Sequence, residues 1–184
     1  MMVAARSPER VAHLILISCA VLEDRYAREM KSAIMARLSA DDRLEMDRLN
    51  ALLNDPHVPK RDELQSALFR LIDKTEFFDR DDAPSERVAT RKGIFDSVWP
   101  EAAALRTSGA LLDIARGIRC PVQVFHGDYD PSPAEGVCAP LSVAIADVHF
   151  HIIKDCGHTP WLERQAKESF YASLEAALMT PPRN

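Results

Sequence analysis

The 184-residue sequence lacks several features that would place it in particular classes of protein. It has no basic cluster, and its net charge of −5 makes nucleic acids and anionic membrane surfaces poor partners. Its apolar runs, such as Leu14 to Ile17, are far too short to cross a bilayer. Residues 1–6 lack the long apolar core of a signal peptide. These absences favour a cytoplasmic protein that binds neither nucleic acid nor membrane.

Cysteine is scarce, and its spacing indicates neither disulfides nor a metal site. The four cysteines, at positions 19, 120, 138 and 156, include no C-x-x-C pair. In a chain without a secretion signal, scattered cysteines are typical of small buried apolar residues. His149 and His151 point to the same side of a predicted strand, but no carboxylate or cysteine stands at a suitable offset to complete a metal site. We therefore expect reduced thiols and neither a metal nor another cofactor.

The sequence does contain three segments that are typical of buried strands. They are Arg10–Ser18, Cys120–Gly127 and Val148–His158. Apolar residues occupy both faces of the first segment, as in a sheet that helices cover on both sides, whereas the other two alternate. A short buried helix is the alternative for each segment, and the flanking proline or glycine favours the strand.

The long segment between the first two strands has helical character. Ser39 is a predicted N-cap, with Asp41 and Asp42 in the first turn where the helix dipole favours them. From Leu64 to Ile72, apolar residues recur at i, i+3, i+4, i+7 and i+8, which is one face of a helix. Further helices are predicted at Pro84-Ser85-Glu86, at Ser108–Ile118, and from Arg164 to the proline pair at 181 and 182.

Strands that alternate with helices indicate an α/β fold with a small parallel sheet and flanking helices. The order is strand, long helical segment, strand, helix, strand, helix. Residues 1–20 and 109–184 are predicted to form the core. Residues 21–108, called the cap segment below, are predicted to be a helical cap inserted at one edge of the sheet.

The loops after the second and third strands carry candidate catalytic residues. Asp128 and Asp130 follow the second strand, and His158 follows the third. Parallel strands end at one sheet edge, where α/β proteins bind their ligands, so an aspartate and the histidine can meet there. Such a pair is two thirds of a nucleophile–base–acid triad. Alternatively, Asp130 caps a proline-containing turn and His158 is only a hydrogen-bonding loop residue.

These motifs resemble the C-terminal part of an α/β-hydrolase. In that family the acid follows the second-last strand as G-x-x-D, here GDYD at residues 127–130, and the histidine follows the last strand as G-H, here residues 157–158. The chain order also fits the family's Ser…Asp…His sequence. The stretch from Ser7 to Ser18 resembles the segment after the family's nucleophile helix. The resemblance implies that Asp130 is the acid and that His158 is the base. Asp128 is the competitor for the acid, because it lies on the same loop, and we expect His126 to orient that loop and not to act as a base.

The family's nucleophile elbow, G-x-S-x-G, is absent, because no serine or cysteine has a glycine two residues to each side. The resemblance implies that Met1 falls inside the helix after the elbow, with the nucleophile and the oxyanion-hole amides upstream. We therefore expect an intact form that hydrolyses small-molecule esters or amides by a Ser-His-Asp mechanism, and a truncated chain that is inactive alone. The alternative is non-catalytic: a truncated product, a pseudoenzyme, or half of a split hydrolase that acts with a partner chain.

The first strand carries one more expectation. The family equivalent of Arg10–Ser18 is internal to the sheet, and its outer neighbour would here lie upstream. An apolar strand with an unpaired edge is a template for pairing with another chain. We therefore expect self-association, binding of a partner chain, or aggregation along the Arg10–Ser18 edge.

Overall fold

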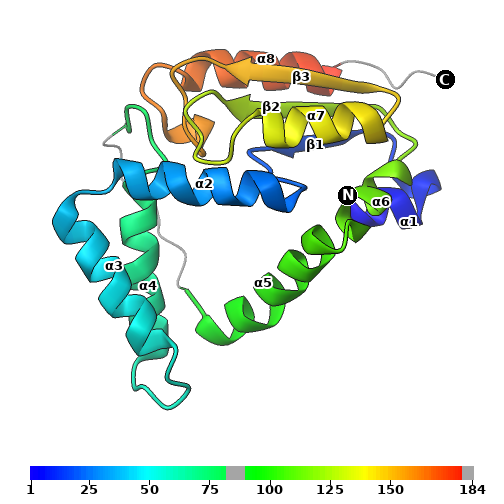
Figure 1. Cartoon of the computed structure of the whole chain (residues 1–184). Coiled ribbons are helices and arrows are strands. Elements are labelled where there is room, and N and C mark those ends of the chain that lie inside the picture. Colours follow the sequence, from blue (N-terminus) through cyan, green and yellow to red (C-terminus); the bar gives the residue numbers. More distant parts are fainter. Residues whose placement is uncertain (82–89, 180–184) are drawn as a thin grey trace.

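The computed structural model describes residues 1–81 and 90–179, which include a three-stranded parallel sheet and a group of helices that extends away from it (Figure 1). Its strands are β1 (Leu14–Ile17), β2 (Val122–Gly127) and β3 (Val148–Ile153). They lie in the order β1-β2-β3, with Val122 between Leu14 and Val148 in register. The α/β fold with a small parallel sheet is therefore confirmed.

All three strands are shorter than the sequence predicts, and β2 begins two residues after the predicted start at Cys120. The predicted Arg10–Ser18 strand keeps only its second half, because Pro8–Arg10 form a 3-10 turn and Ser18 leaves the strand with φ 48°. β3 ends well before His158, because Asp155 adopts φ 51° and turns the chain. Left-handed backbone at a residue other than glycine interrupts the extended ladder at both places.

Helices cover both faces of the sheet, as the double-sided apolar pattern of the first strand predicts (Figure 1). One face packs against α1 (Met2–Arg6), α6 (Ala110–Arg116) and α7 (Glu135–Ala144), in a core that includes Val122, Val124 and Leu141. The other face packs against α8 (Lys167–Met179), where the rings of Phe125 and Phe170 meet edge to face at 5.9 Å. The candidate residues lie in the loops that follow the carboxyl ends of β2 and β3.

Most of the described cap segment is helical, and loops join its helices. Its helices are α2 (Asp24–Arg37), α3 (Ala40–Leu53), α4 (Arg61–Asp73) and α5 (Lys92–Thr107). Ser39 caps α3 as predicted, because its side chain accepts a hydrogen bond of 3.1 Å from the amide of Asp42. α3 and α4 share an apolar core of their own, which includes Leu49 and Leu71. The division into core and cap stays a prediction, and the predicted helix at Pro84-Ser85-Glu86 lies outside the described residues.

α5, which has Pro100 inside it and an exposed Trp99, was not predicted as a separate helix. Across residues 1–81 and 90–179, no helix combines the length and the apolar character needed to cross a membrane.

β1 is an edge strand in the part of the chain that the structure describes. Its backbone pairs with β2 on one side and with no strand on the other. All four of its residues are half-buried. The open edge that the sequence leads us to expect is present, and association along it stays a prediction.

Candidate active site

The loop after β2 is bonded directly to the loop after β3. The amides of Asp128 and Tyr129 donate to the carbonyls of Ile153 and Cys156, each at 2.9 Å. Gly127 makes this approach possible, because a Cβ at that position would lie 2.1 Å from the carbonyl oxygen of Cys156. The two loops that carry the candidate acid and base therefore lie side by side.

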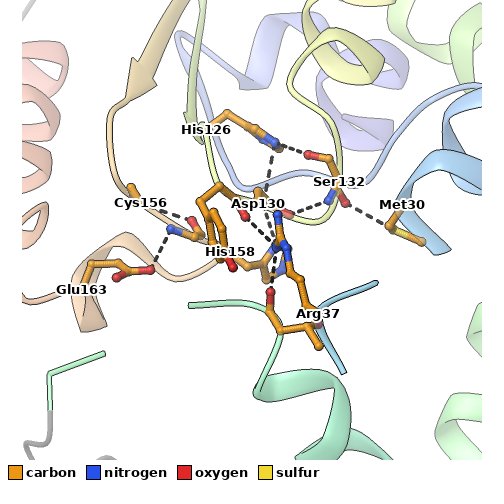
Figure 2. Close-up of polar contacts among 11 residues, drawn as sticks. Met30, Arg37, His126, Asp130, Ser132, Cys156, His158 and Glu163 are labelled. Carbon is orange, nitrogen blue, oxygen red and sulfur yellow. Dashed lines mark hydrogen bonds and ion pairs between the residues drawn. The ribbon is translucent and has the colours of Figure 1, made fainter. Parts of the chain in front are cut away.

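Asp130 and His158 meet between these loops (Figure 2). The distance between His158 Nδ1 and Asp130 Oδ2 is 2.8 Å, so Nδ1 donates to the carboxylate. The other carboxylate oxygen accepts the amide of Ser132, also at 2.8 Å. The Asp130 side chain is 1% exposed and that of His158 is 34% exposed. This is the contact that the strand ends predict, and its role in catalysis stays a prediction.

Charges around the imidazole favour its protonated form. Burial alone would lower the pKa of His158, but the hydrogen bond and charge of Asp130, together with the charge of Glu76, raise it. Glu76 is half-buried, and its own pKa is raised mainly by burial, with the positive charge of His158 acting in the opposite direction. An imidazolium formed at His158 would thus be stabilised by two carboxyl groups, as a general base requires after it accepts a proton.

The second ring nitrogen of His158 remains available. Among the residues that the structure describes, Nε2 takes part in no hydrogen bond, and the side chain is partly exposed. With Nδ1 occupied by Asp130, Nε2 can accept a proton from a hydroxyl group placed beside it. The geometry therefore suits general-base chemistry once a nucleophile is supplied.

Asp128 and His126 have other roles. Asp128 is exposed and accepts the amide of Cys156 at 3.4 Å, so it stabilises the turn and is not the partner of His158. His126 is fully buried, and its Nε2 bonds to the carbonyl of Ser132 at 2.8 Å and lies 3.7 Å from the Asp130 carboxylate. These contacts agree with a residue that orients the loop after β2, which carries Asp130 and is called the acid loop below.

His149, His151 and the four cysteines belong to no cluster of potential metal ligands in the described residues. His151 bonds to Gln123 at 2.6 Å and stacks on a phenylalanine ring, and His149 bonds to Asp147 at 3.1 Å. No group of three or more potential metal ligands occurs within the described parts of the chain. All four cysteines are free thiols. Burial raises the pKa of Cys19 and of Cys156 to about 12, so neither forms a nucleophilic thiolate at neutral pH.

Sequence reasoning missed Arg37, which anchors the acid loop to the cap segment (Figure 2). Its Nη1 donates to the carbonyls of Thr75 and Tyr129, at 2.7 and 2.8 Å. The guanidinium also lies over the ring of Tyr129, 3.7 Å from its centroid. No sequence signal could have identified this arginine, because its two partners are 38 and 92 residues away.

Glu163 was missed as well, although it contacts the loop after β3, which carries His158 and is called the histidine loop below. It is fully buried, and its carboxylate accepts the amide of Gly157 at 2.7 Å. Nothing in the sequence distinguishes this glutamate from the exposed Glu168 and Glu175 nearby.

Comparison with known proteins identifies the fold. No family model and no curated protein matches the sequence. Among solved structures, VinJ is 19% identical with a TM-score of 0.56, over 95% of this chain and 60% of that one. The proline iminopeptidase of Mycobacterium smegmatis is 22% identical with a TM-score of 0.52, over 96% of this chain and 59% of that one.

A third solved structure, an alpha/beta fold family hydrolase from Bacillus anthracis, is 16% identical with a TM-score of 0.61, over 95% of this chain and 61% of that one. The chain thus spans about three fifths of the length of these proteins. At such identities the shared feature is the fold. The residues that the structure describes form part of an α/β-hydrolase fold.

Proposed function

We propose that this chain is part of a hydrolase that cleaves ester or amide bonds by a Ser-His-Asp mechanism, with Asp130 as the acid and His158 as the base. The observation that carries the proposal is the 2.8 Å bond between His158 Nδ1 and the buried Asp130 carboxylate. That bond fixes the imidazole so that Nε2 is the nitrogen left to act on a nucleophile.

In this mechanism, Nε2 of His158 takes the proton of a serine hydroxyl as its oxygen attacks the substrate carbonyl. Asp130 holds the imidazole in the required tautomer and stabilises the imidazolium, which the neighbouring Glu76 also favours. The imidazolium then gives its proton to the leaving alcohol or amine. A water molecule, activated by Nε2 in the same way, releases the acyl group from the serine.

The serine itself comes, on this proposal, from residues other than these 184. The described serines near the pair are engaged or buried. Ser132 Oγ lies 3.3 Å from the sulfur of Met30, and the amide of Ser132 holds Asp130. Ser18 ends β1 with φ 48° but is 8% exposed and lacks the flanking glycines of an elbow. The open edge of β1 is the natural place for the strand that would carry the nucleophile.

Hydrolysis of an activated ester such as p-nitrophenyl acetate tests the proposal. The 184-residue chain is assayed alone and together with the polypeptide, encoded upstream or separately, that carries an elbow. We expect no turnover by the chain alone above its Asp130→Asn and His158→Ala variants. We expect turnover by the completed protein, reduced roughly 10⁶-fold by His158→Ala.

Two results would overturn the proposal. Turnover by the chain alone that depends on His158 would show that the nucleophile lies within it, and Ser18→Ala would then identify or exclude Ser18. Turnover by the completed protein that is indifferent to His158→Ala would show that the pair is not catalytic. An inactive completed protein would favour the non-catalytic alternative.

A further inference from the structure

Glu163 is a fully buried carboxylate that forms no ion pair within residues 1–81 and 90–179. Backbone amides take the place of a cation. Oε1 accepts from Gly157 at 2.7 Å and from Phe78 at 2.9 Å, and Oε2 accepts from Asp79 at 2.8 Å. Burying a carboxylate is costly unless such charge-assisted bonds replace its water. The three bonds make Glu163 a fixed point between two segments that are far apart in the sequence.

One of these segments carries His158, and the other is the connector (residues 75–81) that follows α4 in the cap segment. Besides the bonds to Glu163, the amide of His158 donates to the carbonyl of Glu76 at 2.7 Å, and the amide of Arg164 donates to the carbonyl of Asp79 at 2.8 Å. The approach is so close that a Cβ on Gly157 would lie 1.8 Å from the Glu76 oxygen. The connector is therefore bonded along the whole histidine loop.

His158 is thus held from two directions. Asp130 fixes its ring through Nδ1, and the connector fixes its backbone through the bond to Glu76. Glu163 fixes both the connector and the peptide directly before His158. Figure 2 shows Glu163 beside the stretch that leads from Cys156 to His158.

We propose that Glu163 is a positioning residue, whose carboxylate ties the Gly157 peptide to the connector and thereby keeps the imidazole of His158 facing Asp130. It touches neither substrate nor reacting atoms and acts only through His158. Its importance for catalysis rests on the proposed function, because a displacement of about 1 Å in a catalytic group can cost roughly 100-fold in rate. The positioning itself does not require that the protein be an enzyme.

The variant Glu163→Gln removes part of this arrangement while keeping the size of the side chain. An amide has one oxygen and one NH2 group, and the NH2 group cannot accept from a backbone N–H. Whichever way the amide is turned, at least one of the three backbone donors loses its acceptor. Glu175→Gln is the matched control, because it makes the same chemical change at an exposed position on α8.

The readout is the pKa of His158, measured by histidine C2–H exchange with mass spectrometry on the folded protein in whatever assembly it forms. We expect Glu163→Gln to lower the pKa of His158 toward its ordinary value, because the bond to Asp130 that raises it is loosened. Asp130→Asn should lower it in the same direction, and Glu175→Gln should leave it unchanged. A pKa of His158 that is the same in Glu163→Gln as in the unmodified protein would overturn the proposal.

A second measurement does not depend on how the variant folds. In the unmodified protein, backbone amide exchange should be at least about 100-fold slower at Gly157, Phe78 and Asp79 than at freely exposed loop amides, because all three donate to a buried carboxylate. Exchange at the rate of exposed amides would overturn the proposal. Neither readout uses turnover, so an inactive completed protein would count against the proposed hydrolase function and not against the role of Glu163.

Discussion

Replacing Gly157 by alanine tests how tightly the connector and the histidine loop are packed. The added Cβ would lie 1.8 Å from the Glu76 oxygen and 2.8 Å from Glu163 Oε1. Because the first of these contacts is with backbone, that carbonyl must move away by about 1 Å or more. Such a shift breaks the bond from the His158 amide and distorts the bond from the Gly157 amide to Glu163.

The expected loss is the sum of those two bonds. A neutral hydrogen bond contributes about 0.5–1.5 kcal/mol and one to a charged group about 1.5–3 kcal/mol. Alanine also lowers the conformational entropy of the unfolded chain, which offsets less than about 1 kcal/mol of this loss. We therefore expect Gly157→Ala to lower the free energy of unfolding by about 1–4 kcal/mol, which for a chain of this size is a fall in Tm of about 2–16 °C.

Thermal and urea unfolding, followed by circular dichroism at one protein concentration, measure the effect. Gly93→Ala is the control, because its added Cβ would meet no atom within 4 Å apart from its chain neighbours and the nearby backbone of α5. There, alanine should stabilise by about 0.5–1 kcal/mol. A Gly157→Ala variant as stable as the unmodified protein would refute the close approach between connector and histidine loop.

Three other predictions concern the cap segment, pH and association. Arg37→Ala should lower the free energy of unfolding by about 1–3 kcal/mol, since two bonds to backbone carbonyls and the stacking on an aromatic ring are lost; urea unfolding should show a much smaller effect for the exposed Arg48→Ala. The pKa of His158 is raised on folding. Protonated His158 therefore stabilises the folded state fully below its unfolded pKa of about 6.5, and this stabilisation is lost as the pH rises through the folded pKa. The urea midpoint of the unmodified protein should exceed that of His158→Gln at low pH, and the difference should shrink as the pH rises over that range. Sedimentation at micromolar concentration should show self-association or aggregation of the chain alone through the open edge of β1, and a monodisperse monomer with a cooperative thermal transition would contradict this.

The sheet and the central pair could be predicted because both depend on local patterns. Alternating apolar residues mark β2 and β3, and parallel strands place the residues after them at one end of the sheet. That rule alone brings Asp130 and His158 together, and the G-x-x-D pattern separates Asp130 from Asp128. The length of β1 was overestimated, because the 3-10 turn at Pro8–Arg10 is a backbone detail that apolar content does not reveal.

The supports of the pair could not be predicted, because they are contacts between distant segments. Glu163 reaches the connector across 84 and 85 residues, and Arg37 reaches the acid loop across 92. From the sequence alone, a charged residue at either position is expected to be exposed, because only the fold brings backbone donors or acceptors around it. The sequence therefore predicts the acid and the base, whereas only the structure shows what holds them in place.

The pairing of acid and base is tested most directly by the pKa of His158 in two single variants of the same loop. Asp130→Asn and Asp128→Asn make the same change two residues apart, in a buried and an exposed carboxylate. Because Asp130, and not Asp128, bonds to Nδ1, we predict that Asp130→Asn lowers the pKa of His158 and that Asp128→Asn leaves it unchanged. An equal or larger effect of Asp128→Asn, or no effect of Asp130→Asn, would contradict the assignment of Asp130 and His158 as the acid–base pair.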